Sequence, residues 1–148
     1  MSERMSASEY RRKFVSPKAV AMARITIQTM PPSANSMRKS FMKGGKIISV
    51  KSDEYAAWKR QAVDEITSQG AGRVDGPYTL AIAAQRHWRS KRARDIDNII
   101  KPISDALVTA GVVSDDSLAE FVSARWADDL GGRAVVIIIQ EAEGGLAA

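Results

Sequence analysis

Alternating apolar and polar residues predict several short β-strands along the chain. The clearest run lies between Pro77 and Gln85, where every second residue from Tyr78 to Ala84 is apolar. Successive side chains of extended backbone point to opposite faces, so this alternation is typical of a strand with one buried face. Similar patterns predict four more strands, at residues 24–30, 46–50, 118–126 and 133–141.

Two other segments repeat their apolar residues at helical spacing. In the first, Tyr55, Trp58, Ala62 and Ile66 fall on one face, which we expect to be buried. Ser52 is suited to cap the N-terminus of this helix, and two acidic residues follow it in the first turn, where the helix dipole favours negative charge.

The second helix is predicted from apolar positions between Ile99 and Ala110. Pro102 is tolerated only near the first turn, which places the start of the helix between Asn98 and Lys101. Gly111 then follows as the capping glycine. We expect both helices to be amphipathic, with one face directed to a shared core.

The elements follow one another as strand, strand, helix, strand, helix, strand and strand. This order predicts an α+β fold, a mixed β-sheet with two helices packed on one face, in a single domain. Residues 31–36 end the first strand with two prolines, and residues 37–46 are interpreted as a basic loop around Gly44 and Gly45. We expect the domain to span residues 24–142, between a basic extension over 1–23 and a tail over 143–148.

Composition excludes several classes of protein. The 148 residues include no cysteine, which excludes disulfide scaffolds, thiolate zinc sites and thiol catalysis. The longest unbroken apolar run, Ala134–Ile139, is too short to cross a bilayer. We therefore expect a cytoplasmic protein with no membrane partner.

The charge is unevenly distributed. Lys and Arg number 22 and Asp and Glu number 17, for a net charge of +5. Residues 1–50 alone carry ten basic and two acidic residues, whereas the remainder is slightly acidic. Such a basic segment indicates a polyanionic partner, of which nucleic acid is the foremost. A solvated basic tail is the alternative interpretation.

The densest chemical signal lies between Arg86 and Asp116. Five cations in nine positions come first: Arg86, Arg89, Lys91, Arg92 and Arg94. Asp95 and Asp97 follow, and in extended backbone both carboxylates would point to one side. Such hard oxygen ligands suit Mg²⁺ or Mn²⁺, and Asp115 and Asp116 could close the site from another strand. The alternative is ordinary helix capping and a plain turn.

Lys101 lies four residues after Asp97 and four before Asp105, so the three would share one helix face. An ion-pair ladder would explain this spacing. The functional interpretation is that Lys101 stabilises the negative charge that develops on a phosphate under attack. The spacing alone does not separate these two interpretations.

These residues resemble a known family. The run Arg94-Asp95-Ile96-Asp97-Asn98, with Lys101, Asp105 and then Gly111 to Asp116, closely resembles the RusA family of Holliday junction resolvases. The earlier segment Met30-Pro31-Pro32-Ser33-Ala34-Asn35 is similar to that family's Pro-Pro-Ser-Asn-Asn stretch. It departs from that stretch at the second asparagine, which is either replaced by Ser36, with Ala34 as an insertion, or displaced. The resemblance covers residues 24–141.

The resemblance implies a homodimeric, Mg²⁺-dependent endonuclease without an organic cofactor, which nicks two opposing strands of a four-way DNA junction. It assigns Asp95, Asp97 and Asp116 as metal ligands, Asp115 as a neighbouring ligand, and Lys101 as the catalytic lysine. Its basic run implies DNA contacts at Arg86, Arg89, Lys91, Arg92 and Arg94. We expect Arg38, Lys39 and Lys43 of the basic loop to bind DNA as well. A role in a phage or prophage is a further expectation. The alternatives are a junction-binding protein without catalysis and an RNA-associated protein.

Overall fold

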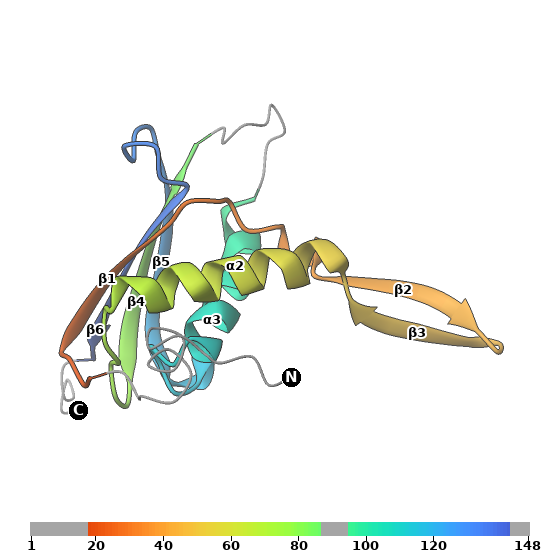
Figure 1. Ribbon diagram of the computed structural model, residues 1–148, viewed down its shortest axis with the longest axis horizontal. Coiled ribbons are helices and arrows are strands. Elements are labelled where there is room, and N and C mark those ends of the chain that lie inside the picture. Colours follow the sequence, from red (N-terminus) through yellow and green to blue (C-terminus); the bar gives the residue numbers. More distant parts are fainter. Residues whose placement is uncertain (1–17, 87–94, 143–148) are drawn as a thin grey trace, which may run out of the picture.

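A computed structural model describes residues 18–86 and 95–142 of the chain (Figure 1). Its main element is a four-stranded sheet in the order β1-β6-β4-β5. The strands are β1 (Met22–Ile27), β4 (Tyr78–Gln85), β5 (Ala119–Ala127) and β6 (Val135–Glu141). β4 and β5 run parallel, while the other neighbouring pairs are antiparallel. The predicted mixed sheet is confirmed.

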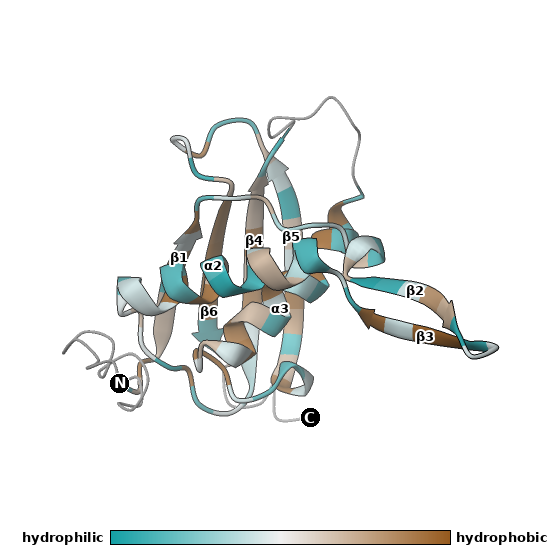
Figure 2. Cartoon of the chain, turned by 45° about the vertical axis from the view of Figure 1, so that its right-hand side comes forward, coloured by the Kyte–Doolittle hydropathy of each residue, from teal (hydrophilic) through white to brown (hydrophobic). Residues whose placement is uncertain are grey.

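Two helices, α2 (Asp53–Gln69) and α3 (Ile100–Thr109), lie over the same face of this sheet (Figures 1 and 2). Along β1, β4 and β6, every second residue is buried over most of the strand, so one set of side chains faces the helices. α3 contributes Ile103, Ala106 and Leu107 to this core, all fully buried. The predicted α+β architecture, with both helices on one face, is confirmed.

The first helix is capped as the sequence predicts. The hydroxyl Oγ of Ser52 accepts a hydrogen bond from the backbone N–H of Tyr55 at 3.1 Å and donates one to the carbonyl of Ser36 at 2.6 Å. Tyr55 and Trp58 lie on the buried face, with ring centroids 6.5 Å apart. Gly70 ends the helix at φ +61°, a conformation that glycine adopts without steric cost.

The segment expected to be a basic loop forms a strand instead. β2 (Arg38–Lys43) pairs with β3 (Lys46–Lys51) in an antiparallel hairpin, which makes a second sheet. Gly44 and Gly45, at φ +58° and +75°, form its two-residue turn. Positive φ at both central positions is what such a hairpin turn requires, and glycine supplies it. The loop prediction was wrong because neither face of this hairpin is deeply buried.

The fold also begins earlier than predicted. β1 starts at Met22, inside the range expected to be an extension, and Ala23 is buried. Before it, the backbone N–H of Val20 donates to the carbonyl of Arg73 at 2.9 Å. The core residue Ala23 and this backbone contact place the start of the fold before residue 24.

A 3₁₀ turn, η2 (Ile96–Ile99), precedes α3, and another, η3 (Asp116–Leu118), precedes β5. η1 (Ala34–Ser36) precedes β2. α3 begins where Pro102 requires, and Gly111 follows its last turn at φ +77°. No helix among the described residues is long and apolar enough to span a membrane.

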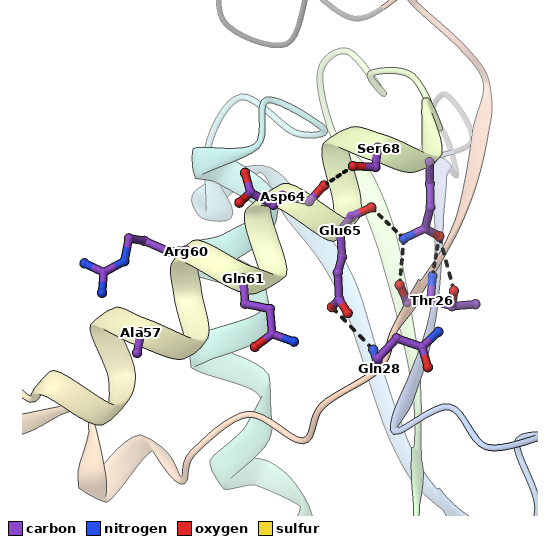
Figure 3. Close-up of a pocket in the computed structure, with 9 residues that line it drawn as sticks. Thr26, Gln28, Ala57, Arg60, Gln61, Asp64, Glu65 and Ser68 are labelled. Atoms are coloured by element: carbon purple, nitrogen blue, oxygen red, sulfur yellow. Dashed lines mark hydrogen bonds between the residues drawn. The ribbon is translucent and has the colours of Figure 1, made fainter. Parts of the chain in front are cut away.

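Side chains of α2 hydrogen-bond to the backbone of the edge strand β1. The Gln69 amide accepts from the backbone N–H of Thr26 at 2.9 Å and donates to its carbonyl at 2.7 Å. Glu65 accepts from the backbone N–H of Gln28 at 3.4 Å, as Figure 3 shows. These bonds close one end of an open hollow of about 640 Å³ between α2 and β1.

Candidate active site

Lys101 lies at the centre of a charged cluster at the predicted site, where it forms ion pairs with Asp105 and Asp116. It lies in the first turn of α3, and its ammonium Nζ is 3.0 Å from Oδ1 of Asp105 and 3.1 Å from Oδ2 of Asp116. Hydrogen bonds to these two carboxylates raise the pKa of Lys101 above its ordinary value. The ammonium is therefore protonated throughout the neutral range.

Asp105 is held from its other side by a buried tyrosine. The hydroxyl of Tyr55, on α2, donates to Oδ2 of Asp105 at 3.0 Å. Burial, with the bond to Asp105 as a smaller cause, raises the pKa of the Tyr55 hydroxyl well above its ordinary value. Tyr55 stays a donor, and a chain of polar contacts runs from α2 through Asp105 and Lys101 to Asp116.

Asp115 and Asp116 lie at the start of η3, just before β5. The carboxylate of Asp115 accepts a hydrogen bond from the backbone N–H of Ser117 at 2.9 Å. This bond is the largest cause that lowers the pKa of Asp115, with smaller effects from Asp116 and Lys101. Asp115 is therefore ionised at neutral pH. The nearby Tyr78 hydroxyl has a raised pKa, first because it is buried and then because of the charges of Asp116 and Asp115.

Asp95 and Asp97 are exposed at the start of η2, which contacts α3 and β5. Asp95 has extended backbone, and its carbonyl accepts from the backbone N–H of Asn98 at 3.1 Å. Asp97 already belongs to the 3₁₀ turn. The two residues therefore do not share the extended backbone on which both carboxylates would point to one side, since the turn that leads into α3 begins between them.

The predicted helix face holds one of its two expected ion pairs. Lys101 pairs with Asp105 as the four-residue spacing predicts, whereas its second partner is Asp116 rather than Asp97. Asp97 precedes the α-helix, so the regular helical spacing that relates Lys101 to Asp105 does not extend to it. The ion-pair ladder of Asp97, Lys101 and Asp105 is therefore formed only in its second half, between Lys101 and Asp105.

The carboxylates fit a divalent cation in their chemistry, but they do not form a closed cage. Within residues 18–86 and 95–142, no group of three or more His, Cys, Asp or Glu side chains is arranged to hold a metal ion. Mg²⁺ commonly takes only one or two carboxylates and completes its shell with water and substrate phosphate. Exposed oxygen donors on Asp97 and Asp116 suit that mode, and the shared metal site stays a prediction.

Of the predicted DNA contacts, four lie among the described residues. Arg86 pairs with Asp128 at 3.2 Å, and Lys39 pairs with Asp53 at 3.5 Å. Arg38 donates to the hydroxyl and the carbonyl of Ser49, across the hairpin. Lys43 is exposed beside the hairpin turn. The others, Arg89, Lys91, Arg92 and Arg94, lie outside the described residues.

Two polar roles were missed at the sequence level. Tyr55 was expected to be a core residue, which is confirmed, but its hydroxyl also binds Asp105. The four-residue spacing predicts an ion pair of Asp105 with Lys101 and says nothing of a second partner. The spacing of Lys101 and Asp105 already indicated their contact, whereas no sequence signal links Tyr55 to a residue fifty positions away.

Comparison with known proteins assigns this arrangement to a class. A family model described as "Endodeoxyribonuclease RusA" matches residues 29–139, which include every predicted site residue. The crossover junction endodeoxyribonuclease RusA of Aquifex aeolicus (strain VF5) is 32% identical over 88 residues, covering 59% of this chain and 67% of that protein. The class is that of the endodeoxyribonucleases. Within it, the chain belongs to the RusA family, as the motif resemblance indicated.

Proposed function

We propose that the protein is a Mg²⁺-dependent, structure-selective endodeoxyribonuclease that resolves four-way DNA junctions by paired symmetric nicks. The observation that carries this proposal is the contact of Lys101 with Asp116 at 3.1 Å, inside the segment matched by the RusA family model. The matched relative is named for its action on crossover junctions. A nuclease that acts on such DNA is expected in the cytoplasm, associated with the nucleoid when bound.

Lys101 supplies fixed positive charge in the proposed mechanism. Attack on phosphorus places extra negative charge on the phosphate oxygens and on the leaving oxygen. An ammonium held between Asp105 and Asp116, with a raised pKa, remains charged while this occurs. Its half-exposed position lets it contact a backbone phosphate that binds beside α3.

Asp95, Asp97 and Asp116, with Asp115 beside them, would hold Mg²⁺, and Mn²⁺ could substitute. The bound ion would polarise the scissile phosphate and activate water as the nucleophile. The hydrogen bond from the backbone N–H of Ser117 is the largest cause that lowers the pKa of Asp115, and it favours the ionised carboxylate that a cation requires. Arg38, Lys39, Lys43 and Arg86 would position the DNA backbone, mostly without reading sequence.

Paired nicking requires two equivalent active sites. A four-way junction presents two equivalent scissile phosphates related by a two-fold axis, and a homodimer with the same symmetry supplies one site for each. We therefore propose a homodimer as the active form, in which each protomer nicks one of two opposing strands.

The decisive experiment is cleavage of a labelled four-way junction with Mg²⁺ titration and an EDTA control, with nicks mapped on all four strands. We expect Asp97→Asn to keep junction binding but to slow nicking by at least about 100-fold, the scale of losing a metal ligand or charge at an active site. Asp64→Asn, which replaces an exposed carboxylate on α2, is the matched control and should cleave normally.

Three outcomes would contradict the proposal. Cleavage by Asp97→Asn at the wild-type rate would show that the assigned site is wrong. Junction binding without cleavage at any Mg²⁺ or Mn²⁺ concentration would favour a binding protein without catalysis. Competition by structured RNA over junction DNA would favour an RNA-associated protein.

A further inference from the structure

The hairpin of β2 and β3 extends away from the four-stranded sheet and both helices (Figure 1). It is attached at its base, where the backbone N–H of Ser52 donates to the carbonyl of Met37 at 2.9 Å and Lys39 pairs with Asp53. Every residue of β2 is exposed. The rest of the fold therefore does not need the outer half of this hairpin for its core.

The outer half of the hairpin carries an exposed apolar pair. Met42 and Ile47 lie directly opposite each other, next to the Gly44–Gly45 turn. Opposed residues of an antiparallel pair project to the same face, so the two side chains form one apolar surface. They are 67% and 76% exposed, the largest values among big hydrophobic side chains of the described residues.

Charge surrounds this apolar pair. Residues 38–51 contain five cations and no acidic residue, and Lys43 and Lys46 oppose each other at the turn. In Figure 2 the turn of the hairpin has hydrophilic colour and hydrophobic colour lies next to it on the strands. Another copy of the same hairpin would be repelled by this charge, whereas a nucleic-acid backbone would be attracted. The charge therefore selects DNA as the occupant.

We propose that the hairpin tip is a branch-point wedge, in which Met42 and Ile47 pack against bases at an interruption of DNA stacking. Lys43 and Lys46 contact the flanking phosphates. Met and Ile are among the side chains that DNA-binding proteins insert between bases, and a two-stranded ribbon is narrow enough to enter a groove. This inference rests on the proposed junction-cleaving function and names the surface that recognises the branch.

The wedge explains a preference for branched over linear DNA. Inserting an apolar side chain into continuous duplex requires unstacking a base step, which costs free energy. At a branch point stacking is already interrupted, so the same apolar contact is made with less unstacking. The lysines bind any phosphate backbone and supply no such preference. Branch selectivity is therefore assigned to the apolar pair and general affinity to the cations.

The test compares wild type with the double variant Met42→Thr and Ile47→Thr, which places a β-branched residue that favours strands at both positions. Junctions carry 2-aminopurine beside the branch point, and binding is measured in EDTA so that no strand is cut. We expect wild type to change the fluorescence of the probe. The variant should lose that change, and its ratio of junction to duplex affinity should fall at least about tenfold.

Lys43→Gln with Lys46→Gln is the matched control in the same hairpin. It should weaken binding to junction and duplex alike. The slope of log affinity against log salt should become shallower by about 0.9 for each phosphate that the variant no longer binds. Circular dichroism and light scattering of all variants check that fold and oligomeric state are kept.

One result would overturn the wedge proposal and leave the proposed function intact. In that result wild type prefers junctions, and the threonine variant retains both the fluorescence change and the ratio of junction to duplex affinity. A threonine variant of altered oligomeric mass would instead assign the apolar pair to an interface between copies, which also overturns the wedge. Failure of wild type to prefer or cut junctions removes the proposed function itself, so the two failures are distinguishable.

Discussion

The position and the raised pKa of Lys101 depend on contacts with neighbouring side chains. Asp105 contacts the lysine directly, and Tyr55 holds the other oxygen of that carboxylate. Tyr55 is 1% exposed, so its position is fixed by the core rather than by solvent. The core of the protein thereby sets the location of a charge at the proposed site.

Replacing Asp105 with asparagine should lower the pKa of Lys101. The hydrogen bond to the Asp105 carboxylate is the largest cause that raises this pKa, and a neutral amide stabilises the ammonium less. Deprotonation of Lys101 should therefore begin at a lower pH than in wild type. NMR titration of isotope-labelled lysine side chains measures it directly. Asp64→Asn serves as the control, and an unchanged Lys101 titration in Asp105→Asn would contradict the role of Asp105.

At the scale of elements, the sequence predicts the helices and strands that have one buried and one exposed face. α2 has a capping serine and a buried stripe, and β4 has alternate buried residues, so both were predicted closely. β2 was missed because it pairs only within a projecting hairpin and buries no residue. Burial imposes the period-two pattern on a strand, and an exposed strand is free of that constraint.

The N-cap of α2 gives a prediction at this scale. Ser52→Ala removes an acceptor for Tyr55 and a donor to Ser36, so we expect the free energy of unfolding to fall by about 1–2 kcal/mol. Urea denaturation measures it. Ser68→Ala is the matched control, since Ser68 is an exposed serine near the other end of the same helix and should change stability by less.

The candidate site could be predicted as a set of residues but not as a geometry. The contact of Lys101 with Asp105 follows from helical spacing, which is local. The contact of Lys101 with Asp116 depends on how η3 returns to α3, which no local pattern encodes. The 3₁₀ turn at Asp97 was missed for a related reason, because acidic residues before a helix suit both extended and turn backbone.

At the scale of the whole molecule, the cationic β2–β3 hairpin and the charged cluster around Lys101 are different parts of the chain. The cationic hairpin extends to one side, while α2 and α3 pack on the sheet and bring Lys101 beside Asp116 (Figure 1). One protomer therefore carries a proposed DNA-binding arm and one proposed active site. The proposed pair of nicks in one junction is therefore assigned to two protomers of the proposed homodimer.

Mixed dimers test this arrangement. We expect light scattering to give twice the mass of one chain at the concentration used for cleavage. Dimers of wild type with Asp97→Asn should nick one strand per junction, whereas dimers of wild type with Asp64→Asn should nick two. Paired nicks from the mixed Asp97→Asn dimer, or a monomer of full activity, would contradict one active site per protomer.

The bonds from Gln69 to Thr26 have a consequence for how this protein behaves at high concentration. Exposed edge strands are templates on which other chains add and aggregate. The amide of Gln69 occupies both backbone groups of Thr26 near the end of β1, and Glu65 occupies the N–H of Gln28 just after it, so an incoming strand finds these groups already bonded. Fibre growth by strand addition to this sheet is thus obstructed at β1, leaving β5 as the edge to protect in any effort to improve solubility.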